Sequence, residues 1–424
     1  MTDSNLPTNA GQRPASDYDT DPYAVLRNRS FVLYLTSRFI ASLGQQMLAV
    51  AVGWEIYERT HSALALGLVG LTQMVPMVLA TLPAGHLADN CNRKRIILAG
   101  TIGVALASLG LTAISAFQLH VNLIYVCLLV AGTARTFLWP ASAAFMPSLV
   151  PRQIFSKAVT WSTGMFHLSS VIGPAAGGYL ISMAHSAAIV YVLNAAALVV
   201  CFLLITFVQD RQVIASRERM TFSSLIAGFR FVLANRIIVG TLTLDMFAVL
   251  LGGATALLPV YAKDILHTGP VGLGVLQAAL PVGSLVTAAI LAHGRSMQKA
   301  GRAMLWSVAG FGLATIAFGY STSFWFSFLM LLVCGALDNI SVVVRHTLVQ
   351  ILTPDEKRGR VSAVNSLFIG TSNEFGGFRA GFVAHWFGPV FSVVFGGIGS
   401  ILVVFATALR WPEIRKYGRL DGEG

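Results

Sequence analysis

Ionisable side chains inside long apolar segments are the residues of this 424-residue chain with the clearest capacity for chemistry. An ionisable group in hydrocarbon costs about 2.5–3.5 kcal/mol on insertion scales, so each one needs a compensating role. At a rise of about 1.5 Å per residue, four of them lie near the middle of their apolar segments, and Arg38 lies in the first third of its segment. The five residues are Arg38, Arg135, Asp245, Asp338 and Glu374.

Three roles are open to these charges. Asp245, Asp338 or Glu374 could take up and release a proton, because a desolvated carboxyl exchanges protons near neutral pH. The same carboxyls could hold a cationic or polar substrate. A third role is static pairing, which neutralises both charges at little net gain. The pairs that the sequence suggests are Arg135 with Asp338 and Arg38 with Asp245.

The segments that carry these residues are expected to be membrane spans. The chain is 55% hydrophobic and 11% charged, whereas a soluble domain is about a quarter charged. A bilayer core requires about 20 mostly apolar residues per helix. Windows of that length lie near 31–57, 64–87, 95–117, 121–146, 155–182, 187–208, 237–261, 271–294, 302–320, 323–350, 360–386 and 389–410. The sequence therefore predicts an all-α membrane protein with twelve transmembrane helices.

These spans divide the chain into two six-helix bundles, 31–208 and 237–410. Residues 209–236 join the bundles as a cytoplasmic linker, in which apolar residues at helical spacing predict an interfacial helix. Residues 1–30 lack a short apolar core and a cleavage site, so we interpret them as a retained cytoplasmic tail. Residues 411–424 form a second predicted tail.

The net charge of +11 is distributed on one side of the predicted membrane. Of the loops on the other side, only those with Arg59 and Lys263 carry cations. This asymmetry is the positive-inside pattern, and it predicts an inner-membrane protein with both termini in the cytoplasm. It accounts for the charge without a nucleic-acid partner. The cations on the first side are Arg27, Arg29, Arg93, Lys94, Arg95, Arg152, Lys157, Arg211, Arg217, Arg219, Arg295, Lys299, Arg302, Lys357, Arg358, Arg360, Arg410, Arg415, Lys416 and Arg419.

An internal repeat with a period of 203 residues relates 147–182 to 350–385. Both copies run from a basic loop into a membrane span, so the halves are predicted to be parallel and pseudo-symmetric about an axis along the membrane normal. Arg135 and Asp338 occupy equivalent positions of the repeat. Further matched positions are Gly173 with Gly376 and Gly178 with Gly381.

The loop between the second and third spans, from Gly85 to Arg95, resembles the signature loop of the major facilitator superfamily. Glycine allows two helices to approach, and Asp89 can cap a helix or pair with a cation. Asn92 replaces the usual glycine, and asparagine tolerates a left-handed backbone. The resemblance implies a conformational latch that does not contact substrate; the simpler interpretation is an interhelical turn. The latch residues are Gly85, Asp89, Arg93 and Lys94.

The fifth span contains a second motif, which resembles the G-P-x-x-G-G core found in exporters of the superfamily. Proline removes a backbone donor and bends the helix, while glycines allow close packing. The resemblance implies export, and a plain packing kink is the alternative. The residues are Gly173, Pro174, Gly177 and Gly178.

Finer patterns resemble the bacterial efflux branch that includes the enterobactin exporter. They lie at 54–57, 67–71, 360–365 and 370–376. The resemblance implies that spans 1, 4, 7 and 10 line a central cavity, and Glu55 near the end of the first span is a candidate outer-gate residue. Many relatives carry an acidic residue in a G-E-F-x-S-G pattern, whereas this chain has Arg379 in the corresponding stretch.

Other classes of function lack sequence support. The chain has no Walker loop, dinucleotide fingerprint or nucleophile elbow. Its four scattered cysteines do not have metal-site spacing. We therefore predict no enzyme activity, cofactor or metal. The expected function is a monomeric, proton-coupled exporter of small amphiphiles such as drugs or siderophore-like compounds, working by alternating access. A lipid or lysophospholipid flippase is the alternative, followed by a transport-inactive sensor or scaffold.

Overall fold

The structure, a computed structural model, describes residues 23–209, 229–293 and 297–418. Those residues contain long helices and no strand. The first half of the chain contributes α2 (Arg29–Thr60), α3 (Ala63–Asn90), α4 (Arg93–Ala116), α5 (Asn122–Leu149), α6 (Phe155–Ala184) and α7 (Ala188–Phe207). The second half contributes α9 (Arg236–Gly252), α11 (Gly269–His293), α12 (Ala300–Gly319), α13 (Phe324–Leu352), α14 (Asp355–Phe387) and α15 (Pro389–Arg410).

Eleven of the twelve predicted spans each coincide with one of these helices, and the seventh overlaps α9 and the short helical segments that follow it, which confirms the fold class. Ten spans within the described residues are long and apolar enough to cross a membrane by length and composition alone. The other two, α6 and α14, carry many Gly and Ser residues, and α14 also carries several charged residues. Both helices pack against the opposite half of the molecule, so part of their surface faces protein instead of lipid.

Short segments extend this bundle at its ends. Before α2, the 3-10 helix η1 (Ala24–Arg27) buries Val25 completely, so the last part of the predicted tail is packed against the bundle. The 3-10 turn η2 (Arg152–Ile154) precedes α6, and α16 (Pro412–Lys416) follows α15. Of the predicted interfacial helix at 209–236, residues 229–234 are helical, and 210–228 lie outside the described residues.

Asparagine side chains fix where three of the helices begin. Asn28 Oδ1 accepts hydrogen bonds from the amides of the first turn of α2, and Asn235 does the same for α9. Asn92 Oδ1 accepts the Arg95 amide at 3.0 Å and so caps α4. The φ angle of Asn92 is −63°, so the prediction of a left-handed backbone at this residue is wrong. Asparagine replaces the usual glycine because its side chain satisfies a free amide at the helix start.

The seventh span is interrupted, although the sequence predicted a continuous helix there. After α9 ends at Gly252, the chain continues as η3 (Ala254–Leu257), α10 (Leu258–Val260) and the π-turn η4 (Tyr261–Ile265). A Cβ on Gly253 would lie 2.7 Å from the Gly376 carbonyl oxygen of α14, so this close approach requires glycine. The break leaves carbonyl groups at the end of α9 without helical partners.

Arg379 of α14 supplies the missing donors. Its Nε donates to the Leu250 carbonyl at 3.1 Å, and its Nη2 donates to the Leu251 carbonyl at 2.5 Å. The cation also lies at the carbonyl end of a helix, where a positive charge is favoured. Arg379 therefore stabilises the break in the seventh span.

Replacing Arg379 with leucine should destabilise the protein, because it leaves the carbonyls of Leu250 and Leu251 unsatisfied. A buried acceptor without a partner costs about 1–3 kcal/mol. Lysine should restore part of this loss, since an ammonium can reach one carbonyl but lacks the planar fork. Thermal unfolding of the purified protein in detergent measures both changes. Equal midpoints for Arg379→Leu and wild type would contradict this role.

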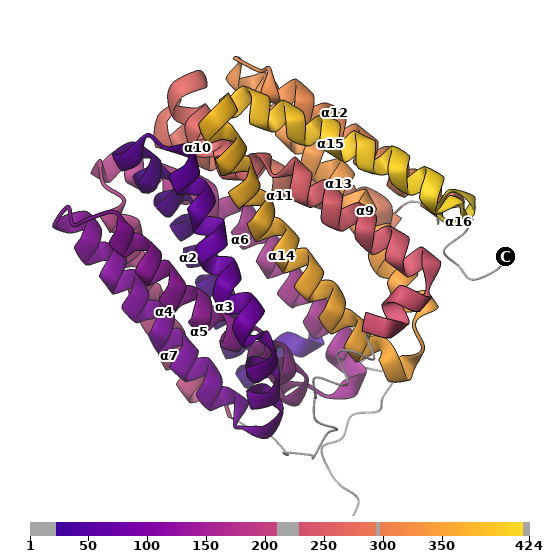
Figure 1. Cartoon of the computed structure of the whole chain (residues 1–424). Helices are drawn as coiled ribbons and strands as arrows, with labels where there is room; N and C mark the ends of the chain where they lie inside the picture. The colour runs from indigo at the N-terminus through magenta and orange to yellow at the C-terminus, as the bar shows by residue number, and fades with distance from the viewer. Residues whose placement is uncertain (1–22, 210–228, 294–296, 419–424) are drawn as a thin grey trace, which may run out of the picture.

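The two halves meet along two helix pairs, α3 with α14 and α6 with α11; Figure 1 shows α3 and α14 side by side in the middle of the molecule. Glycines make both approaches possible. A Cβ on Gly381 of α14 would lie 2.7 Å from Gly67 Cα of α3. A Cβ on Gly178 of α6 would lie 2.2 Å from the Pro270 carbonyl oxygen of α11. The repeat thus places equivalent glycines, 178 and 381, at equivalent contacts between the halves.

The halves share a hydrophobic core at only one end. We call one end the basic end, because cations lie in or directly after its turns at 90–93, 149–155 and 352–355: Arg93, Lys94, Arg152, Lys157, Lys357 and Arg358. One cluster of buried residues, which includes Ile56 and Leu257, combines both halves at the opposite end. The other clusters each belong to a single half. The halves are therefore joined at the opposite end, and in Figure 1 their helices diverge away from the α10 region.

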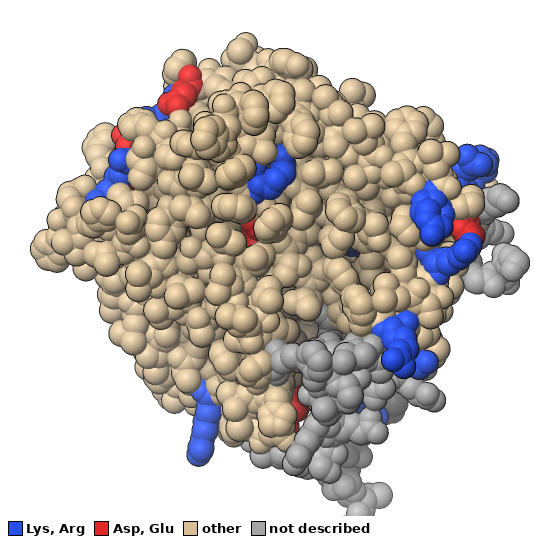
Figure 2. Space-filling model, viewed as in Figure 1, with Lys and Arg blue, Asp and Glu red and all other residues tan. Residues whose placement is uncertain are grey.

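The outer surface suits a lipid environment. Figure 2 shows a face that is mostly uncharged, with most of its visible Lys, Arg, Asp and Glu side chains toward the edges. Large apolar side chains such as Leu79, Leu106 and Leu409 are more than half exposed in the protein alone. In a membrane, contact with lipid acyl chains keeps these apolar side chains out of water, so their exposure does not destabilise the protein.

Candidate substrate cavity

A cavity of about 620 Å³ lies between the halves. Helices α2, α3, α5 and α6 line it from one half, and η3, α10, α11, α13 and α14 line it from the other. Its walls mix apolar side chains such as Leu48 and Val69 with polar groups, a combination that suits an amphiphilic small molecule. The polar residues are Gln45, Gln46, Gln73, Arg135, His167, Ser170, Thr255, Gln277, Ser284, Asp338, Asn373 and Glu374.

Three of the predicted charges line this cavity together: Arg135, Asp338 and Glu374. Arg135 Nη1 donates to Gln73 Oε1 at 3.1 Å. Its Nε and Nη2 have no hydrogen-bond partner, and among the described residues Arg135 forms no ion pair. The suggested Arg135–Asp338 pair is therefore wrong. The cavity holds charges that remain available to other partners.

The sign of charge differs between the two walls of the cavity. The guanidinium of Arg135 belongs to α5 of the first half, whereas the carboxylates of Asp338 and Glu374 belong to α13 and α14 of the second. Glu374 stands where α14 packs against α3, because a Cβ on Gly70 would lie 2.5 Å from its carbonyl oxygen. A relative movement of the halves would therefore change the distance between unlike charges.

Asp245 lies apart from the cavity and forms a buried ion pair with Arg345 of α13. The two residues are 6% and 2% exposed. The suggested pair of Asp245 with Arg38 is therefore wrong. Arg38 is exposed, and its guanidinium lies over the Trp139 ring, 6.0 Å from the centroid. Of the three roles considered, static pairing applies to Asp245, with a partner that the sequence did not indicate.

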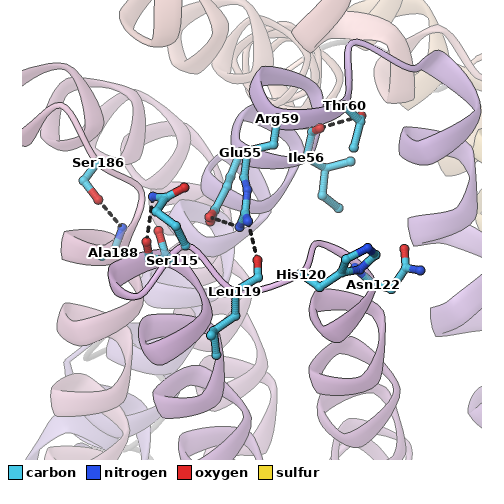
Figure 3. Close-up of polar contacts among 11 residues, drawn as sticks. Glu55, Ile56, Arg59, Thr60, Ser115, Leu119, His120, Asn122, Ser186 and Ala188 are labelled. Carbon is cyan, nitrogen blue, oxygen red and sulfur yellow. Dashed lines mark hydrogen bonds and ion pairs between the residues drawn. The ribbon is translucent and has the colours of Figure 1, made fainter.

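Glu55 is bonded within its own half, as Figure 3 shows. Its Oε1 accepts Arg59 Nη1 at 3.2 Å, and Arg59 also donates to the Leu119 carbonyl between α4 and α5. The polar contacts that α2 makes with the other half come from Tyr57 and Glu58. Tyr57 donates to Asp264 Oδ2. Lys263 Nζ lies 2.7 Å from Glu58 Oε2.

A sequence profile of transmembrane secretion effectors of the major facilitator superfamily matches residues 20–418. This chain belongs to that superfamily. It is 28% identical over 393 residues to the enterobactin exporter EntS of Citrobacter koseri, covering 92% of this chain and 93% of the relative. EntS of Escherichia coli O1:K1 / APEC matches at the same identity and coverage. The protein is therefore a multi-pass membrane protein of a secondary transporter family.

Solved transporters share the fold at low sequence identity. A bacterial homologue of the human lysosomal transporter Spinster, in an inward-facing and occupied conformation, aligns with a TM-score of 0.71 at 13% identity. The alignment covers 92% of this chain and 98% of that one. A POT family transporter in complex with 5-aminolevulinic acid gives a TM-score of 0.72 at 12% identity, with coverages of 91% and 97%.

The signature loop of the superfamily ties helix ends together at the basic end. Arg93 Nε donates to the Ala88 carbonyl at 3.2 Å, and Arg93 Nη1 donates to Ala144 of α5 at 3.0 Å. Lys94 Nζ donates at 2.8 Å to both the Thr206 and Val208 carbonyls, at the end of α7. Cations at helix C-termini satisfy free carbonyls and oppose the helix dipole. Gly85 and Asp89 lie in the last turns of α3. Their role as a latch stays a prediction.

The exporter-type motif of α6 contacts two neighbours. Gly173 and Gly177 face α2, where added Cβ atoms would lie 2.5 Å from Gln46 Cβ and 3.0 Å from Met47 Cα. Gly178 faces α11 of the other half. Pro174 lines the cavity. The motif therefore packs α6 between its own half and the opposite half.

Proposed function

We propose that this protein is a proton-coupled exporter of small amphiphilic molecules, such as drugs or siderophore-like compounds, in the bacterial inner membrane. The observation that carries the proposal is the amphiphilic cavity between the halves, with Arg135 on one wall and Asp338 and Glu374 on the other. Protonation of either carboxyl changes the attraction between the walls. A proton can therefore be exchanged for substrate as the halves move by alternating access.

Two observations support the outward direction. The curated relatives that match most of the chain are named enterobactin exporters. The motif at Gly173–Gly178 resembles the exporter motif and packs between the halves. We take the basic end as cytoplasmic because of the positive-inside rule. The structure is then inward-facing, and the contacts of Tyr57 with Asp264 and of Lys263 with Glu58 close the outer end.

Transport driven by a pH gradient in proteoliposomes tests this function. Asp338→Asn and Glu374→Gln each remove one titratable group from the cavity while nearly preserving its volume. We expect at least one of them to lower pH-driven transport tenfold or more. Exchange of labelled for unlabelled substrate without a gradient should continue, because that exchange needs no net proton transfer.

Glu413→Gln is the matched control, because Glu413 lies outside the cavity in an exposed ion pair with Arg236. It should transport like the wild type. Full pH-driven transport by both Asp338→Asn and Glu374→Gln would refute proton coupling through this cavity. Failure of every tested amphiphile to move in wild-type vesicles would refute export itself.

A further inference from the structure

A second, smaller cavity lies within the first half, between α2, α5 and α6. Its volume is about 170 Å³, and we call it the side pocket. It adjoins the central cavity because Phe166 lines both. Its lining includes Tyr34, Arg38, Trp139, Met146, Met165 and Phe166. One cation therefore stands among aromatic rings and thioethers.

Arg38 has no acidic partner in the side pocket. No carboxylate lines the pocket, and Arg38 forms no ion pair with the described part of the chain. Its guanidinium contacts the face of Trp139 instead, at 6.0 Å from the ring centroid. A cation–π contact leaves the N–H donors at the edge of the guanidinium free for another ligand.

The pocket also has a shape and a surface that suit a flat ring. Trp139 is 65% exposed and Phe166 is 48% exposed in the protein alone, so both rings are open to contact. Met146 and Met165 provide flexible apolar surface, which adapts to ligands of different outline. A volume of about 170 Å³ accommodates one small aromatic group with an acidic substituent, and not a whole large amphiphile.

We infer that the side pocket binds the anionic group of a flat, apolar organic anion, with Arg38 pairing with the acid and Trp139 stacking on the ring. This inference rests on the proposed export function and assigns its cargo to organic anions. Arginine binds carboxylates through two parallel hydrogen bonds, which gives the site its geometric preference. Arg135 in the central cavity, with Nε and Nη2 unpartnered, is the next cation that the anion reaches.

The distribution of charge argues against a cationic cargo at this pocket. Arg38 and Arg135 both belong to the first half, and the carboxylates of the central cavity belong to the second. A cation in the side pocket would face Arg38 without a counter-charge. An anion there gains a charge-assisted hydrogen bond, which is stronger than a neutral one.

Binding of three naphthalene probes to the purified full-length protein in detergent tests this site. 2-Naphthoate, 2-naphthalenemethanol and 2-naphthylmethylammonium share one ring system and differ in charge. Isothermal titration should give the tightest binding for naphthoate. Arg38→Gln should weaken naphthoate binding at least tenfold and leave binding of the alcohol within twofold, and Arg38→Lys should recover part of the loss. Trp139→Ala should weaken binding of naphthoate and the alcohol alike.

Arg152→Gln is the control for net charge, because Arg152 is an exposed cation outside both cavities. It should bind naphthoate like the wild type. The inference is overturned if Arg38→Gln binds naphthoate as tightly as wild type, or if the ammonium probe binds wild type as tightly as naphthoate does.

The measurement needs no pH gradient, so it is independent of the proposed coupling. Arg38-dependent naphthoate binding in a protein that moves no amphiphile would keep the site and refute the export function. Transport of amphiphiles by a protein whose naphthoate binding does not depend on Arg38 would refute only the site. Titration in nanodiscs with and without phosphatidylglycerol separates free anions from lipid headgroups. A tenfold loss of naphthoate affinity caused by that lipid would overturn the assignment to cargo.

Discussion

Replacing Asp245 with asparagine is expected to destabilise the folded protein by about 3–5 kcal/mol. The change leaves the guanidinium of Arg345, which is 2% exposed, without its counter-charge. Breaking a buried pair is costly because one charge stays desolvated and uncompensated. The midpoint of thermal unfolding in detergent and the yield of folded protein from the membrane measure the effect.

Removing both charges should be much less harmful than removing one. The double variant Asp245→Leu with Arg345→Leu replaces the pair with apolar groups, a change that is often nearly neutral in stability. Glu413→Gln breaks the exposed pair with Arg236 and should cost less than about 1 kcal/mol. A double variant that unfolds at the same temperature as Asp245→Asn would argue against an uncompensated charge as the cause.

Replacing Gly178 with valine is expected to disrupt the contact between the halves. Even the Cβ atom would lie 2.2 Å from the Pro270 carbonyl oxygen, so α6 and α11 would have to separate. Overpacking of this kind costs about 1–3 kcal/mol. Because the contact belongs to the end where the halves share a core, we expect transport to fall at least tenfold and the unfolding midpoint to drop.

Gly164→Val is the matched control, because it adds the same side chain to the same helix. Nothing lies within 4 Å of a Cβ at Gly164. The loss of helix flexibility is shared by both variants, and only Gly178→Val meets a neighbouring backbone. Equal transport and equal stability of the two variants would show that the close approach at Gly178 is not required.

The residues that pair across the fold show where sequence reasoning reached its limit. Asp245 and Arg345 are 100 positions apart, and the spacing of either within its span does not indicate which neighbour it faces. Opposite charge alone suggested a pair of Asp245 with Arg38. Likewise, the unusual cation at Arg379 is visible in the sequence, whereas the end of α9 beside it is not. Adjacent glycines at 252 and 253 were the available signal for that break.

The sequence by itself determined that the chain is a membrane protein, the number and approximate positions of the spans, the internal repeat and the superfamily. These follow from composition, span length and motif spacing, which are properties of the chain read in order. The tertiary structure decided which charges share the cavity and which are paired: Arg135, Asp338 and Glu374 line it together, and Asp245 does not. The physical reason lies in the membrane. Lipid and protein interior are both apolar, so hydrophobicity does not fix the rotation of a span about its axis, and only packing does.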